Sequence, residues 1–149
     1  MRLAPVVLFA SNEEEAESLA YEQSILTHGE EAARATAWFG RLLFHSAMHG
    51  LDAEAIPTEI RRRNRNRVSS SGFYKDTMEA AMWAVAGTST FEEAVIQAVN
   101  FGDDADTVGA VGGQLAGAIY GENGIPPRWL ERLAWRIELR ELAQELIHS

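Results

Sequence analysis

Three aspartates and a threonine lie within one five-residue stretch, as Asp103, Asp104, Asp106 and Thr107. Carboxylates so close together repel one another unless a cation or the positive end of a helix compensates their charge. If a helix begins near Ala105, Asp104 becomes its N-cap residue, and Asp106 and Thr107 fall in its first turn. Carboxylate and hydroxyl oxygens form a hard ligand set that suits magnesium, calcium or manganese better than zinc or copper. The cluster therefore predicts a cation site, with magnesium as the expected ion.

Helix capping alone is the competing explanation for this acidic cluster. Aspartate is favoured at the N-cap and in the first turn of a helix, where it needs no metal. Capping explains about two of the four residues, and the remaining oxygens favour metal binding. A calcium loop of the EF-hand type is excluded, because counting from Asp104 the fifth and twelfth positions are Val108 and Leu115, where that loop requires oxygen ligands.

Glycines recur at four-residue spacing after the acidic cluster, at Gly109, Gly113, Gly117 and Gly121. Each glycine inside a helix costs about 1 kcal/mol relative to alanine, so another interaction must offset this loss. Residues four apart share one helix face, and glycines there leave a bare stripe that a second helix or a ligand can approach closely. We expect close helix packing beside the metal site, with ligand contact as the alternative.

The acidic cluster and the glycines together form a longer motif that resembles the C-terminal metal motif of the ADP-ribosylglycohydrolase family. It runs from Gly102 to Ala118 and reads GDDADTVGAVGGQLAGA. Other segments resemble the family in the same order along the chain. They are Met1–Pro5, similar to N-G-x-L-M-R-x-x-P; Ser24–His28, similar to S-x-x-T-H; Ser71–Thr77, similar to S-G-Y-x-x-D-T; and Glu92–Ala94 and Ile125–Trp129, which fall in register. Several matches in one order are far more specific than a single motif.

The resemblance implies a chemistry as well as a fold. It implies an all-helical protein with a binuclear magnesium site, which manganese sometimes occupies, and hydrolysis of the bond between C1″ of ADP-ribose and a protein side chain or small acceptor. Asp104, Asp106 and Thr107 match the metal ligands of the family motif, and Asp103 is an extra acid that supports or caps them. ADP-ribose or an ADP-ribosylated protein is the implied binding partner.

Three further residues match family positions that contact ADP-ribose. The resemblance places His28 near the bound ligand, and Gly72 with Phe73 along the nucleotide. The residues alone leave other roles open, because His28 beside Gly29 can act as a cation at the negative end of a helix, and Phe73 can belong to the core. The resemblance favours the ligand role for His28 and leaves both roles open for Phe73.

The chain departs from the family pattern at its start, which matches the beginning of the family's second half. The N-terminal T-D-D and G-D-x-x-G segments, which include the family's other metal ligands, are absent from residues 1–149. We therefore expect a single domain that is a partial ADP-ribosylglycohydrolase domain lacking the N-terminal half, with half a metal site and no general base assigned. The isolated chain is expected to be inactive. Helix faces left bare would bind a separate N-terminal half or a second copy of the chain.

A non-catalytic module is the alternative function. In that case the chain binds ADP-ribose, or keeps the fold for structural or partner contacts, as a jellyfish lens crystallin resembling this family does.

Helical periodicity predicts the elements that position these residues, and the expected fold class is all-α, a compact multi-helix domain. Ser11 and Glu14 form a predicted capping box, and Thr90 and Glu93 form a second one. Residues 6–9 are the one β-like run. The predicted helices span about 12–28, about 32–47 with an end at Gly50, about 76–85, the segment after Thr90, 105–120, and the C-terminal segment from Leu130 to Leu146.

Residues 51–72 are predicted to form a connector between helices. Its arginine run, 61–67, is expected to be solvated or to contact a diphosphate or an acidic partner.

Composition sets further bounds. The 149 residues are 46% hydrophobic and 23% charged, as expected for one soluble globular domain, and the absence of cysteine excludes disulfides, thiolate zinc sites and a cysteine nucleophile. The net charge of −9 disfavours nucleic acid and anionic membranes as partners. The apolar start, Leu3 to Ala10, faintly resembles a signal peptide, but Pro5 interrupts it and no cleavage site follows. We expect a cytoplasmic protein that does not span a membrane.

Overall fold

The computed structural model describes residues 1–50 and 55–147. Every regular element in these ranges is a helix, which confirms the predicted all-α class. No helix in the described ranges combines the length and the apolar character needed to cross a membrane. The α-helices are α1 (Ala4–Phe9), α2 (Glu13–Ile25), α3 (Glu30–His49), α4 (Thr58–Arg61), α5 (Tyr74–Ala86), α6 (Phe91–Val99), α7 (Ala105–Tyr120), α8 (Pro127–Leu130) and α9 (Arg136–Ile147), and the short 3-10 helices are η1 (Arg65–Arg67) and η2 (Glu122–Gly124).

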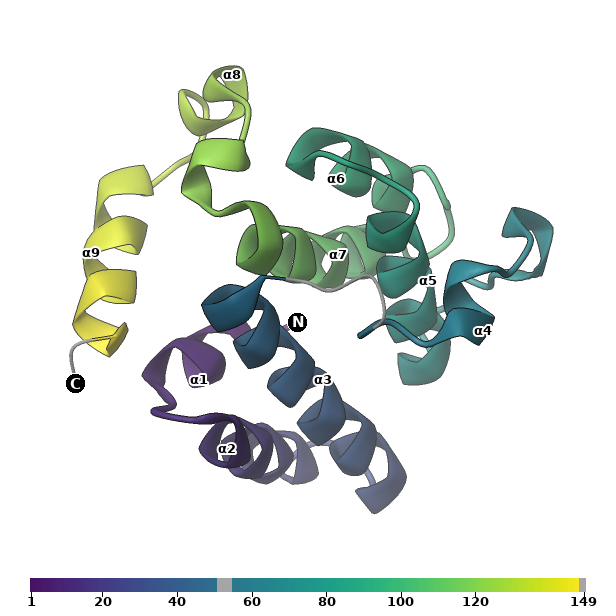
Figure 1. Ribbon diagram of the computed structural model, residues 1–149, viewed down its shortest axis with the longest axis horizontal. Helices are drawn as coiled ribbons and strands as arrows, with labels where there is room; N and C mark the ends of the chain where they lie inside the picture. Colours follow the sequence, from purple (N-terminus) through teal and green to yellow (C-terminus); the bar gives the residue numbers. More distant parts are fainter. Residues whose placement is uncertain (51–54, 148–149) are drawn as a thin grey trace.

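Two groups of helices pack side by side (Figure 1). The first group consists of α1, α2 and α3, and the second of α5, α6 and α7. Helix α3 joins the groups because it packs on both α2 and α7. From the end of α7 the chain continues through α8 to α9, which packs on α1. Helix α7, which begins at the acidic cluster, contacts α5 and α6 of its own group and α3 of the other group.

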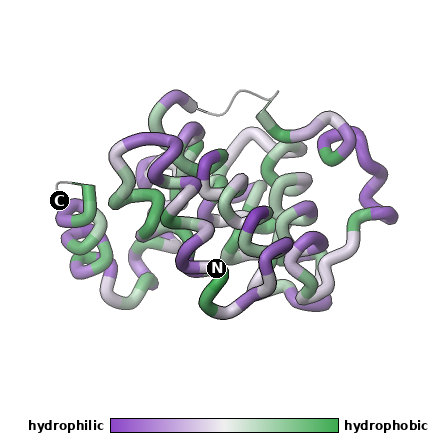
Figure 2. Tube along the Cα trace, turned by 90° about the horizontal axis from the view of Figure 1, so that it is seen from below, coloured by the Kyte–Doolittle hydropathy of each residue, from purple (hydrophilic) through white to green (hydrophobic). Residues whose placement is uncertain are grey.

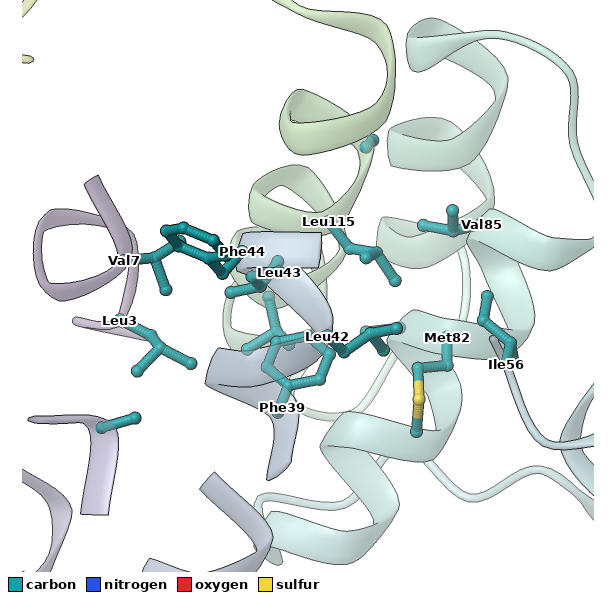
Figure 3. Packing of buried hydrophobic residues seen from close by; sticks show 14 of the residues in the cluster. Leu3, Val7, Phe39, Leu42, Leu43, Phe44, Ile56, Met82, Val85 and Leu115 are labelled. Carbon is teal, nitrogen blue, oxygen red and sulfur yellow. The ribbon is translucent and has the colours of Figure 1, made fainter. Parts of the chain in front are cut away.

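The main core lies between α3, α5 and α7 and extends to α1 (Figure 3). Leu43 of α3 and Leu115 of α7 are among the largest fully buried side chains, and Leu3 and Val7 of α1 belong to the same cluster. The position of α1 is also fixed by a hydrogen bond, since the Ala4 backbone N–H donates to Oε1 of Gln114 on α7 at 2.9 Å. The N-terminal segment is therefore part of the core.

The β-like run at residues 6–9 lies in helix α1, in agreement with the all-α prediction. Pro5 stands in the first turn of α1. A helix tolerates proline there because a backbone N–H at this position, which proline lacks, has no hydrogen-bond partner within the helix. Leu3 and Val7, four residues apart, are both buried. Packing of this single face outweighs the strand preference of the valines.

Helix α2 begins one residue later than the predicted capping box implies. The N-cap is Asn12, whose Oδ1 accepts a hydrogen bond from the Glu15 N–H at 2.9 Å. In return, Oε2 of Glu15 accepts from the Ser11 N–H at 2.7 Å. The predicted pair of Ser11 and Glu14 was therefore wrong by one position, and the returning bond goes to the residue before the N-cap rather than to the N-cap itself.

Two other predicted boundaries have different outcomes. The second capping box is confirmed at the start of α6, where Oγ1 of Thr90 accepts from the Glu93 N–H at 3.1 Å. The single C-terminal helix predicted from Leu130 to Leu146 is wrong, because α8 ends at Leu130 and α9 begins at Arg136. Between them the backbone of Trp135 adopts a positive φ of 58°, which a continuous right-handed helix cannot contain.

The connector predicted for 51–72 contains the short helices α4 and η1, and its first four residues lie outside the described ranges. Its arginine run is mostly exposed, and a hydrophilic stretch lies at the edge of the tube in Figure 2. Arg63 pairs with Glu79 at 2.5 Å, and the Arg65 guanidinium lies 3.8 Å from the centre of the Phe101 ring. The run therefore packs the connector onto its neighbours while most of its charge stays in solvent.

The glycine stripe of α7 is only partly a helix-packing surface. A Cβ at Gly109 would lie 2.7 Å from Cγ1 of Val99 on α6, so this glycine permits the close approach that was predicted. At Gly113 and Gly117 a Cβ would meet no described atom within 4 Å, which contradicts the prediction for these two positions. A different glycine, Gly40 of α3, stands at the α2–α3 contact, where its Cβ would lie 2.6 Å from Cβ of Ala20.

Alanine substitutions at these glycines should have opposite effects on stability. Gly113→Ala or Gly117→Ala should raise the free energy of unfolding by about 0.5–1 kcal/mol, because alanine favours the helix and meets no neighbour. Gly40→Ala should lower it by about 1–3 kcal/mol, because α2 and α3 must separate. Urea denaturation of the three variants provides the test. Destabilisation by Gly113→Ala would show that another surface covers this face.

Candidate functional site

Helix α7 begins at the acidic cluster as predicted. Asp104 is its N-cap, and Asp106 and Thr107 lie in its first turn. The Asp104 side chain caps no backbone N–H of the helix; its Oδ1 instead accepts a hydrogen bond from Oγ1 of Thr107 at 2.9 Å. The capping explanation therefore does not account for this carboxylate. Asp104 and Thr107 are half-buried and Asp106 is exposed, so their oxygens are accessible from solvent.

The turn before α7 places Asp103 in contact with the loop that precedes α5. Gly102 and Asp103 both have positive φ, of 82° and 47°, a conformation that glycine and aspartate tolerate better than most residues. Oδ2 of Asp103 accepts a hydrogen bond from Oγ of Ser70 at 3.3 Å. The Asp104 backbone N–H donates to the Ser70 carbonyl at 3.2 Å. Asp103 thus ties the start of α7 to the loop that precedes α5.

Gly72 in that loop lies against the acidic cluster. A Cβ at this position would lie 3.0 Å from Oδ2 of Asp104, so a side chain here would press on the carboxylate and shift it slightly. The loop is held by Asp76, whose Oδ2 accepts hydrogen bonds from the hydroxyls of Ser69 at 2.8 Å and Ser71 at 2.6 Å. The sequence segment that contains Gly72 therefore shapes the surroundings of Asp104.

A cavity of about 430 Å³ opens beside these elements. Its lining comes from the N-terminal residues, the α2–α3 junction, the start of α5 and one face of α7. His28, Gly72 and Thr107 all line it, although they are far apart in the sequence. Nδ1 of His28 lies 2.9 Å from Oγ1 of Thr27, and Oγ1 of Thr27 accepts a hydrogen bond from Arg2 at 3.2 Å. Three of the residues predicted from sequence thus share one cavity.

The other predicted residues lie outside the lining of this cavity. Asp104 lies behind the lining: it is hydrogen-bonded to Thr107 and adjacent to Gly72, and both of these residues line the cavity. Asp103 and Asp106 are not among the lining residues. Phe73 is the N-cap of α5, and its side chain is 53% exposed. It is therefore not a core residue.

Tyr74, and not Phe73, lines the cavity beside Gly72, and sequence reasoning missed it. The two rings are neighbours, with centroids 4.7 Å apart. The adjacent Lys75 forms a 2.5 Å ion pair with Glu31 at the start of α3, and this ammonium lowers the pKa of the Glu31 carboxyl. The only sequence signal for Tyr74 was the presence of two adjacent aromatic residues in a segment where the family pattern has one.

The donor set at the start of α7 fits a hard divalent cation. Two carboxylates and one hydroxyl supply oxygen ligands, and magnesium commonly completes its six ligands with water and substrate oxygens. Among the described residues, a group of three acidic or histidine side chains that converges closely enough to hold a metal ion occurs elsewhere, at Glu13, His45 and His49. The three aspartates do not converge in this way, consistent with the bond between Asp103 and Ser70.

Comparison with known proteins identifies the family. The family model for ADP-ribosylglycohydrolase matches residues 1–149. The ADP-ribosylarginine hydrolase Tri1 of Pseudomonas putida is 38% identical over 98% of this chain and 44% of that protein, and the ADP-ribosyl-[dinitrogen reductase] glycohydrolase of Rhodospirillum rubrum is 44% identical over 52% of this chain and 26% of that protein. A solved structure described as an ADP-ribosylglycohydrolase-related protein complex has a TM-score of 0.87 and 39% identity over 99% of this chain and 58% of that chain. The chain thus spans less than half the length of both relatives. It belongs to the ADP-ribosylglycohydrolase family.

Proposed function

We propose that these 149 residues form a metal-binding and ADP-ribose-binding part of an ADP-ribosylglycohydrolase, a hydrolase of the bond between C1″ of ADP-ribose and a protein side chain or small acceptor. The observation that carries this proposal is the cavity lined jointly by His28, Gly72 and Thr107. Family membership supports the reaction class, because both relatives described above are named as enzymes that act on ADP-ribosyl groups.

The metal ligands in this proposal are Asp104, Asp106 and Thr107, with magnesium or manganese as the ion. A bound divalent cation would orient a water molecule and ribose oxygens and balance negative charge. Asp104 holds its position through Thr107, and Gly72 leaves the space that the carboxylate needs. Asp103, bound to Ser70, keeps the turn in place. In the complete family site we expect two metal ions.

The ADP-ribose ligand would occupy the cavity beside these residues. His28 would contact it from the α2–α3 junction, and Gly72 would let it approach the backbone closely. Phe73, half-exposed beside Tyr74, is in a position to stack on the part of the nucleotide that extends beyond the cavity. Hydrolysis builds positive charge on the sugar ring. No residue of this chain is assigned as the general base.

We further propose that the catalytic unit contains family sequence in addition to residues 1–149, from a separate N-terminal half, or that the chain associates with a second copy. Exposed apolar side chains support this proposal. Trp135, Ile137 and Leu142 are 75%, 69% and 57% exposed, and the C-terminal helix alternates between hydrophobic and hydrophilic residues along its length (Figure 2). Surfaces of this kind commonly mark protein contacts. A cytoplasmic location and the absence of nucleic-acid binding stay predictions from composition.

A complementation assay tests the proposed function. The chain would be mixed in magnesium buffer with the part of the P. putida relative that lies outside the matched region, and release of ADP-ribose from an ADP-ribosylated arginine substrate would be followed. We expect ADP-ribose binding by the chain alone and release only in the mixture. Binding without release in any mixture would support the alternative, a non-catalytic ADP-ribose-binding or structural module. Absence of both would refute the proposal.

His28 offers a separate prediction. His28→Ala should weaken magnesium-dependent ADP-ribose binding about tenfold, the low end for a hydrogen bond to a charged group at an exposed site. Titration calorimetry of the variant measures this change, and His49→Ala, a histidine that does not line the cavity, is the matched control. Unchanged affinity in His28→Ala would instead assign His28 to the helix-end role.

A further inference from the structure

A second cluster of metal-binding side chains lies between the start of α2 and the end of α3. Glu13 is the first residue of α2, and His45 and His49 stand one turn apart on α3. One potential ligand atom from each residue lies within 4.8 Å of the other two. Nδ1 of His45 is 2.8 Å from Oε1 of Glu13, and the two imidazole centroids are 5.1 Å apart. None of the three residues lines the ADP-ribose cavity.

The fold holds these residues together through local features of both helices. The Asn12 cap fixes the first turn of α2 and therefore the position of Glu13. Further along, Ala16 and Ala20 are fully buried, and Gly40 allows α3 to approach α2 closely. The small residues thus bring the helix axes near enough for the Glu13 carboxylate to reach His45 across the interface.

The charges around the cluster leave one carboxylate oxygen available to a cation. Oε2 of Glu13 accepts a hydrogen bond from Arg41 at 3.0 Å, while Oε1 faces His45. The hydrogen bond to His45, followed by the charge of Arg41, lowers the pKa of Glu13, so the carboxyl is ionised at neutral pH. A metal ion between Oε1 of Glu13 and Nδ1 of His45 would keep the carboxylate paired.

Two imidazoles and one carboxylate form a ligand set that differs from the one at α7. Imidazole suits zinc, copper and nickel, whereas magnesium prefers oxygen ligands. Zinc bound by two histidines and one glutamate, with water in the fourth position, is a known arrangement. Zinc–ligand bonds are about 2.0–2.2 Å long, so atoms bound to one zinc ion lie closer together than 4.8 Å. The three candidate ligand atoms lie within 4.8 Å of one another and would have to move closer to bind the ion. His49 is exposed at the end of its helix, so a change of rotamer can close this gap.

We propose that Glu13, His45 and His49 form a zinc-type site that clamps α2 to α3, separate from the hard-cation site at the start of α7. Such a site would bind a softer ion than the site at α7, and its coordination bonds would link α2 to α3. It does not depend on whether the chain binds ADP-ribose.

Zinc titration of the tag-free chain against a chromophoric chelator tests the proposal. The assay would be run at about pH 7.5, with excess magnesium to occupy oxygen-only sites. We expect one tightly bound zinc per chain. His49→Gln should weaken zinc binding at least about tenfold, and the His45→Gln, His49→Gln double variant should abolish it. Circular dichroism would establish that each variant is folded.

The matched control is His28→Gln. It removes a histidine that does not belong to the cluster and should leave zinc affinity unchanged. NMR adds an independent readout, since zinc should shift the ring resonances of His45 and His49 and leave those of His28 in place. Equal zinc affinity in the wild-type chain and the double variant, or no zinc binding by the wild-type chain, would overturn the proposal.

Discussion

Asp104→Asn should abolish magnesium-dependent binding of ADP-ribose while the chain stays folded. The amide oxygen of asparagine can still accept the hydrogen bond from Thr107 that Oδ1 of Asp104 accepts at 2.9 Å. The variant therefore removes charge and changes little in shape. Loss of an ionised ligand should cost at least the 10–100-fold in metal affinity that is typical of changes to the groups around a metal site. Titration calorimetry with ADP-ribose, in magnesium and in EDTA, measures the effect.

Asp103→Asn is the matched control for this prediction. Asp103 hydrogen-bonds to Ser70 and has a positive φ, which asparagine tolerates. We expect this variant to bind magnesium and ADP-ribose almost as well as the wild-type chain, whereas Asp106→Asn should resemble Asp104→Asn. If Asp104→Asn retains wild-type affinity, or Asp103→Asn loses as much, the proposed ligand assignment is wrong.

Leu115→Ala should lower the free energy of unfolding by about 2–5 kcal/mol, the usual cost of truncating a fully buried leucine. Leu115 is 0% exposed in the middle of α7 and lies in the core with Leu42 and Val85 (Figure 3). A loss of this size is a large part of the roughly 5–15 kcal/mol that stabilises a typical domain. Urea denaturation with linear extrapolation gives the value.

Leu26→Ala provides the control for Leu115→Ala because the chemical change is identical and Leu26 is 82% exposed. We expect it to change stability by less than about 0.5 kcal/mol. Equal effects of the two substitutions would contradict the arrangement in which α7 is the central helix of the core.

Local signals in the sequence predicted the parts of the fold that depend on neighbouring residues. The capping box at Thr90 and Glu93 follows from a hydrogen bond within one helical turn, and the start of α7 at Asp104 follows from the preference of aspartate for the first positions of a helix. The segment around Ser11 offered several equivalent caps, because three glutamates follow Asn12, and the choice between them depends on one residue of register. Local chemistry therefore identified the helix but not its first residue.

Tertiary contacts decided the features that local signals could not. Helix α1 forms because Leu3 and Val7 are buried and Gln114 caps its start from α7, and neither contact is visible in residues 1–10. Gly113 and Gly117 share the four-residue spacing of Gly109, yet only Gly109 faces a close neighbour in the described ranges. The four-residue spacing of glycines shows that they share one face of the helix. It does not show whether that face packs against another helix.

The candidate site shows the same division. His28, Gly72 and Thr107 were predicted from separate motifs, and the fold brings them to one cavity. Tyr74 was missed because the sequence does not say which of two adjacent aromatic residues turns inward at the start of a helix. The group of Glu13, His45 and His49 was also missed, since its carboxylate comes from another helix and only the two histidines share a recognisable spacing.

A crystal structure of the chain with manganese and ADP-ribose tests the central claim most directly, because manganese scatters anomalously and marks its own position. We predict an anomalous peak within bonding distance of oxygens from Asp104, Asp106 and Thr107, and nucleotide density in the cavity beside His28. Manganese absent from this helix start, with ADP-ribose bound elsewhere or not at all, would contradict the account.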